Sequence, residues 1–184
     1  GYTLWSKPEV LGSYYSKCSD GGLIMTSGFL VTTDNYDIRV IKTDNLGVIQ
    51  WDRLYGCSGY DHSYDITQTL DSGFMVLVQK SCNPLYSLYL MKLNFYGDTL
   101  WSKALSLGYP ISFQQTQDSG FILTGSINNG NDYDILLIKT DSLGNSPAFI
   151  PEIIKKDFGI ISLVNPVRQQ LEIIYKLNNP VQKI

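Results

Sequence analysis

Short runs of apolar residues, separated by turn residues, follow one another along the first 144 positions. The run 135–140 has apolar residues on both alternating faces, which is typical of a strand lying between two neighbours. The run 64–69 alternates apolar and polar residues and leads into an Asp-x-Gly turn. Helical spacing is nowhere sustained in residues 1–144. The pattern therefore predicts a succession of short β-strands.

One turn and strand motif occurs three times, at 20–26, 71–77 and 118–124. Each copy is an Asp-x-Gly turn followed by an apolar strand. Because the acid recurs in every copy and catalysis needs only one site, we interpret it as a turn-capping residue. The repeat markers of this motif are Asp20, Asp71, Asp118, Gly22, Gly73 and Gly120.

Two further markers recur in the same register. Turn glycines stand at Gly1, Gly47, Gly97 and Gly144, at intervals of 46, 50 and 47 residues, and the first three are followed four residues on by Trp5, Trp51 and Trp101. The sequence Tyr-Asp-Ile-x-x-Ile-Lys-Thr-Asp-x-Leu-Gly appears at 36–47 and again at 133–144. Agreement of the markers indicates an internal repeat.

Each unit reads as four short antiparallel strands, which is the signature of a β-propeller blade. We predict an all-β fold with repeats at 1–46, 47–96 and 97–144. Three blades are fewer than the 4–8 that propellers typically have. Either the blades belong to a longer chain, or several chains pool their blades, or the stack stays open; we favour the first. Residues 2–7 resemble a fourth strand, able in principle to complete the blade at 111–140.

The character of the chain changes after Gly144. Residues 145–157 contain two prolines and then charged residues, and we predict a linker there. Residues 158–184 give apolar strands around an Asn165-Pro166 turn, in which Leu171 and Ile173 alternate with polar neighbours.

Composition narrows the classes of function. Charged residues make up 17% of the 184 residues and the net charge is -3, so the basic patch of a nucleic-acid binder is not visible. No apolar run approaches the ~20 residues of a membrane helix. Of the three cysteines, Cys57 and Cys82 are able to form a disulfide if the protein is exported, but we favour the interpretation of all three as small, half-buried, unpaired residues.

Few residues suggest chemistry. His62 is the only histidine and has Asp61 and Ser63 beside it, but neighbours on a strand point to opposite faces, so no catalytic triad is expected. Residues 128–134 resemble a calcium loop in composition but lack its spacing and its distal Glu. We predict a polar hairpin there and no cofactor.

The tryptophans have two interpretations, as platforms that stack on sugars or as packing residues between blades. Their place on the outer strand of each unit favours packing. If a ligand binds, we expect it at the loop ends near the centre of the blade array, where the residues are Tyr60, Asp61, His62 and Tyr109.

Residues 1–144 resemble the secreted β-propeller repeats common in Bacteroidetes, and 97–101 match their Gly-Asp-Thr-Leu-Trp motif as it stands. Residues 160–184 look like the start of a type IX secretion (type A) C-terminal sorting domain. Asn165-Pro166-Val167 and Leu171-Glu172-Ile173 match that family, whereas Leu163-Val164 replaces its Tyr-Pro. The resemblance implies export across the outer membrane, with the secretion machinery as partner and the propeller as passenger.

We therefore expect a non-catalytic, extracellular or cell-surface propeller that acts as a binding or spacer module, with a glycan or protein as ligand. One alternative is a carbohydrate- or peptide-binding accessory domain of a larger secreted enzyme. A second is a hydrolase whose acids converge on the propeller channel, which requires a cluster of unpaired carboxylates there.

Overall fold

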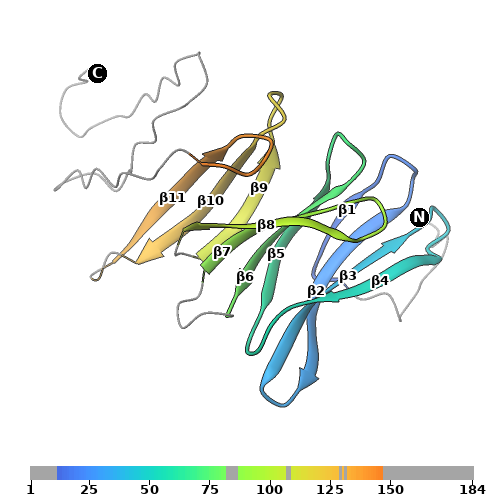
Figure 1. Ribbon diagram of the computed structural model, residues 1–184, viewed down its shortest axis with the longest axis horizontal. Helices are drawn as coiled ribbons and strands as arrows, with labels where there is room; N and C mark the ends of the chain where they lie inside the picture. Colours follow the sequence, from blue (N-terminus) through green and yellow to red (C-terminus); the bar gives the residue numbers. More distant parts are fainter. Residues whose placement is uncertain (1–11, 82–86, 107–108, 129, 131, 147–184) are drawn as a thin grey trace, which may run out of the picture.

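The structure, a computed structural model, describes residues 12–81, 87–106, 109–128, 130 and 132–146. These residues form three antiparallel β-sheets, and no helix is present among them (Figure 1). The all-β prediction is confirmed. The strands are β1 (Tyr14–Lys17), β2 (Leu23–Thr32), β3 (Asn35–Thr43), β4 (Ile49–Tyr55), β5 (His62–Gln68), β6 (Phe74–Lys80), β7 (Ser87–Leu93), β8 (Thr99–Ser106), β9 (Tyr109–Gln115), β10 (Phe121–Asn128) and β11 (Tyr133–Thr140).

Each sheet is a meander in which consecutive strands pair. The first sheet has the order β1-β2-β3-β4, the second β5-β6-β7-β8 and the third β11-β10-β9. The tryptophan strand that opens a sequence unit is the last strand of the preceding sheet, so the sheets are offset by one strand from the predicted units. The described sheets lie in a row, and they do not close into a ring in this part of the chain (Figure 1).

Two apolar layers hold the row together. Strand β6 lies at the centre and its successive side chains point to opposite faces. Phe74, Val76 and Val78 pack against the first sheet, whereas Met75 and Leu77 pack against the third. The unbroken apolar sequence of β6 follows from this position, because both of its faces are covered.

The Asp-x-Gly turns require unusual backbone conformations. Their middle residue is left-handed in all three copies, with φ of +83° at Gly21, +64° at Ser72 and +63° at Ser119. The following glycine has no room for a side chain, since a Cβ on Gly73 would lie 2.3 Å from the Lys92 ammonium. The recurrence of glycine at this third position thus has a steric cause.

The cysteines differ in state. Cys18 is a buried free thiol whose pKa is raised to about 11 by burial. Cys57 is disulfide-bonded, so the interpretation of all three cysteines as unpaired is wrong for Cys57. Cys82 lies outside the described residues, as do Trp5 and the sorting-motif residues Asn165, Pro166, Leu171 and Ile173.

The described residues include no helix that is long and apolar enough to cross a membrane.

Candidate functional site

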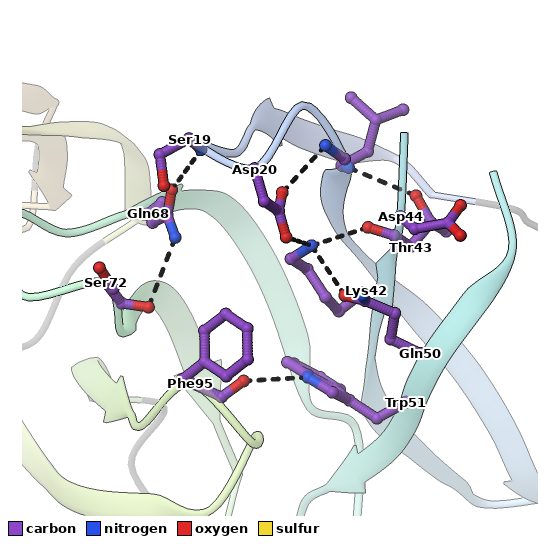
Figure 2. Close-up of polar contacts among 12 residues, drawn as sticks. Ser19, Asp20, Lys42, Thr43, Asp44, Gln50, Trp51, Gln68, Ser72 and Phe95 are labelled. Carbon is purple, nitrogen blue, oxygen red and sulfur yellow. Dashed lines mark hydrogen bonds and ion pairs between the residues drawn. The ribbon is translucent and has the colours of Figure 1, made fainter. Parts of the chain in front are cut away.

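The repeated aspartate of each Asp-x-Gly turn forms an ion pair with a lysine of the third strand of its own sheet. In the first sheet Lys42 is fully buried, and its ammonium lies 2.7 Å from Asp20 Oδ2. It also donates to the Thr43 carbonyl at 2.7 Å and to Gln50 Oε1 at 3.0 Å (Figure 2). The other carboxylate oxygen of Asp20 accepts from the Gly22 amide at 2.9 Å. The acid therefore caps the turn and neutralises a buried cation.

The same arrangement recurs in the other two sheets. Lys92 lies 2.8 Å from Asp71, and Lys139 lies 2.9 Å from Asp118. Hydrogen bonds from Lys139, Thr116 and the turn amide hold the pKa of Asp118 at about 2. Burial opposes the ionisation of Asp71, but bonds from Lys92, Thr69 and the turn amide outweigh it and bring its pKa to about 2. These aspartates are structural and remain ionised at neutral pH.

A glutamine ends the first strand of the second sheet (β5) and of the third sheet (β9), and it ties each of these two sheets to the turn of the sheet before it. Gln68 accepts from the Ser19 amide at 2.7 Å and donates to the Ser72 carbonyl at 3.4 Å (Figure 2). Gln115 repeats this one sheet later, accepting from the Leu70 amide at 3.1 Å and donating to the carbonyl of its own turn at 3.2 Å. The bonds from the Ser19 and Leu70 amides therefore join successive sheets, and the other two hold the glutamine against its own turn.

The tryptophans also join neighbouring sheets. The Trp51 indole donates to the Phe95 carbonyl at 3.1 Å, and its ring meets Phe74 edge-on at 5.7 Å between centroids (Figure 2). The ring also lies against Gly97, the turn glycine of the second sheet. Trp101 lies against Gly144 of the third sheet in the same way. Neither indole is presented as a free platform for a sugar.

The Thr-Asp-x-x-Gly turns are closed by their own polar residue. Asp44 accepts from the amides of Leu46 at 2.8 Å and Val48 at 2.9 Å. Asn94 and Asp141 make the same pair of bonds at the equivalent places in their sheets. The side-chain oxygens of these residues accept hydrogen bonds within the turn, so they offer few free acceptors to a ligand.

The predicted ligand-contact residues do not act as one group. Asp61 is buried and accepts from the Cys57 amide at 2.7 Å and the Ser81 amide at 2.8 Å, so it fixes the loop between the first two sheets. It is not available to a ligand, which corrects that part of the prediction. Tyr60 stacks on Tyr36 at 5.7 Å between ring centroids and belongs to the same loop.

His62 and Ser63 differ sharply in exposure. His62 opens β5 and is exposed, whereas Ser63 is buried and its hydroxyl has no hydrogen-bond partner among the described residues. The Asp61 carboxylate is bonded to backbone amides. Asp61, His62 and Ser63 therefore do not form a catalytic triad.

Several tyrosines lie at or near the first residues of β1, β5, β9 and β11. Tyr109 opens β9 and its ring lies 5.7 Å from that of Tyr133, which opens β11. A hydrogen bond with Tyr133 raises the pKa of Tyr109. Burial raises the pKa of Tyr64 on β5, and the neighbouring Tyr14 of β1 and Tyr109 raise it further. Tyr14, Tyr109 and Tyr133 are 39%, 48% and 56% exposed, so this tyrosine cluster offers aromatic surface from the first and third sheets.

No known protein family matches this chain, and a search of curated proteins found no similar protein.

The inner strands, which are the first strand of each sheet in chain order (β1, β5 and β9), carry few acidic residues. Asp65 is their one carboxylate in the described chain, and it accepts from Ser112 Oγ at 2.6 Å and the Phe113 amide at 3.1 Å. No group of three or more His, Cys, Asp or Glu that could hold a metal ion occurs among the described residues. The part of the predicted calcium-like loop that is described shows Asn128 accepting from the Gly130 amide at 2.7 Å, as in a turn.

Sequence reasoning missed the role of the lysines, of Gln68 and Gln115, and of Tyr133. Lys42 and Lys139 were visible as members of the repeated Lys-Thr-Asp sequence, and Lys92 stands at the equivalent place before Leu93-Asn94. Glutamine stands five residues before the Asp-x-Gly glycine only in the second and third copies, and Lys17 takes its place in the first. Tyr133 was visible only as a repeat marker, because its approach to Tyr109 depends on how β9 and β11 lie in the third sheet.

Proposed function

We propose that the protein is a non-catalytic binding module of stacked β-propeller-type blades, exported to the cell surface. The observation that carries the proposal is the division of labour among its polar and aromatic side chains. Recurring aspartates, lysines and tryptophans hold the turns and the blades together, whereas two tyrosines of the third sheet turn aromatic surface to solvent. Tyr109 and Tyr133 present their rings together and expose about half of each.

A tyrosine surface of this kind suits a ligand with both apolar faces and hydroxyl or amide groups, such as a glycan or an extended peptide. Each ring offers apolar contact area, and each phenol offers a hydrogen-bonding group, at a small cost in conformational entropy. The described inner strands supply no pair of carboxylates, so no observation favours the hydrolase alternative.

Binding is tested by titrating the full 184-residue chain against panels of soluble polysaccharides and unstructured peptides with calorimetry. We expect at least one panel member to bind, and Tyr109→Ala or Tyr133→Ala to weaken it tenfold or more. Tyr96→Ala is the matched control, because Tyr96 is 68% exposed but lies in the turn between β7 and β8. Binding that is equally strong in all three variants, or absent with every panel member, would overturn the proposal.

Export rests on the resemblance of residues 158–184 to a sorting domain. Expression in a bacterium that has a type IX secretion system, with and without these residues, tests it. The proposal expects surface-exposed protein only from the longer chain, and retention of both chains inside the cell would refute this part.

A further inference from the structure

The outward face of the third sheet is bare at positions that are covered in the other two. Ile135 of β11 corresponds in the repeat to Leu88 of β7 and Ile38 of β3. Leu88 and Ile38 are 1% and 0% exposed because the next sheet packs on them, whereas Ile135 is 66% exposed. Burying an aliphatic side chain of this size is favourable, so a further surface packed against this face would stabilise it.

The lysines of the repeated ion pairs are also most exposed in the third sheet. The side chains of Lys42 and Lys92 are 0% and 7% exposed, and that of Lys139 is 20% exposed. In the first sheet, Trp51 stands opposite Lys42 across the β3–β4 pair. In the second sheet, Trp101 stands opposite Lys92 across the β7–β8 pair. In the described part of the third sheet, no strand stands beside Lys139 on that side.

The missing neighbour is a fourth strand. Strand β3 pairs with β4 and β7 pairs with β8, but β11 pairs only with β10 in the described chain. An edge of this kind leaves alternate backbone amides and carbonyls free to pair with another strand. The required strand has a known sequence, because β4 and β8 are built from the tryptophan segments of the repeat.

Residues 1–7 carry that sequence. Gly-Tyr-Thr-Leu-Trp-Ser-Lys at 1–7 matches Gly-Asp-Thr-Leu-Trp-Ser-Lys at 97–103 at every position but the second. In the second sheet the segment 99–103 forms β8 and places Trp101 opposite Lys92. We propose that the free edge of β11 binds residues 3–7 of a second copy of this chain, with Trp5 opposite Lys139, and that the first sheet of that copy, which follows this segment, packs on the face that carries Ile135.

A second copy is required because the first and third sheets lie at opposite ends of the row (Figure 1). From Tyr14, where β1 begins, back to Lys7, the chain spans at most about 24 Å. Crossing two sheet spacings of about 10 Å and three strand spacings of about 4.8 Å takes about 25 Å in a straight line. That line runs through the packed sheets, so the chain's own segment falls short. The contact is head-to-tail and builds chains or rings of copies.

Sedimentation velocity of the full chain over a range of concentrations tests this proposal. We expect assembly beyond the monomer that grows with concentration. Trp5→Ala removes the donor side chain and Ile135→Lys places a charge on the acceptor face, and each should weaken assembly tenfold or more. Leu143→Lys is the matched control, since Leu143 is 58% exposed in the turn after β11 and should leave assembly unchanged. Unchanged circular dichroism and melting temperature show that a variant is folded.

Mixing the two defective variants gives a sharper result. The Trp5→Ala chain keeps an intact acceptor edge, and the Ile135→Lys chain keeps an intact donor segment. The mixture should therefore form mixed dimers and stop there, while each variant alone stays monomeric. A wild-type chain that is monomeric at all concentrations, assembly that survives both substitutions, or a mixture that forms no dimer would each overturn the proposal.

Discussion

Replacing Asp20 by alanine leaves the buried Lys42 ammonium without its anionic partner, and it is the most informative perturbation of this fold. The variant keeps the bonds from Lys42 to the Thr43 carbonyl and to Gln50, but it loses the only anion within 4 Å that pairs with this lysine in the described structure. Breaking a buried ion pair from one side typically costs about 3–5 kcal/mol.

An upper limit for the charge part of that cost follows from proton chemistry. Deprotonating a lysine of ordinary pKa, about 10.4, costs about 4.6 kcal/mol at pH 7 and only about 1.2 kcal/mol at pH 9.5. Loss of the bond from the Gly22 amide adds about 1 kcal/mol at either pH. We therefore expect Asp20→Ala to lower the free energy of unfolding by about 3–5 kcal/mol at pH 7, and by about 2 kcal/mol at pH 9.5.

Urea unfolding of the full chain at the two pH values measures the effect. Asp118→Ala is the matched control, because Lys139 is partly exposed and water can solvate it after the pair is broken. Its cost should be smaller and nearly independent of pH. In the double variant Asp20→Ala/Lys42→Met the buried charge is gone, and most of the stability should return. A cost for Asp20→Ala that does not change with pH, or a double variant less stable than Asp20→Ala, would refute the reasoning.

Three further predictions use the same unfolding assay. The pKa values of Asp71 and Asp118, both about 2, lie below that of an unfolded aspartate, so their contribution to stability is complete above about pH 4 and is lost as the pH falls toward 2; an unfolding midpoint that is flat over this window would contradict their roles. Trp51→Ala should cost about 3 kcal/mol, and Trp51→Phe about 1 kcal/mol because it loses the indole bond and keeps most of the packing; equal costs would argue against the packing role. Gly73→Ala should cost about 1–3 kcal/mol through its clash with the lysine ammonium and the neighbouring carbonyl, whereas Ser72→Gly should raise stability by up to about 1 kcal/mol by relieving a left-handed serine; a tolerated alanine at position 73 would contradict the clash.

The fold could be predicted from the sequence as far as strands and turns, because those depend on local signals. Alternation, Asp-x-Gly and Thr-Asp-x-x-Gly each fix a few residues at a time. The run 135–140, apolar on both faces, was expected between two neighbours, but β11 pairs only with β10 in the described chain. Whether the sheets close into a ring depends on the angle between neighbours, and no residue pattern of a single blade determines that angle.

The candidate site was predicted less well. Asp61 and Tyr109 both stood at loop ends in the sequence, yet the structure buries one and exposes the other. The difference comes from partners far along the chain: Ser81 lies 20 residues after Asp61, and Tyr133 lies 24 residues after Tyr109. Polar loop residues acquire their roles from such distant contacts, which composition does not reveal.

The glutamine link between sheets has a consequence for how such a chain can change in length. In the contacts between sheets, Gln68 and Gln115 each bond to the turn of the sheet before their own, and Trp51 and Trp101 each lie against the turn glycine of the sheet after their own. A duplicated or deleted unit that begins and ends at equivalent residues would join two surfaces that already fit one another. Such a gene can gain or lose whole units of 46–50 residues in a single recombination event and still encode a folded array, whereas an insertion of half a unit would leave a sheet without its edge. Among relatives of this protein, lengths should therefore differ in whole blades.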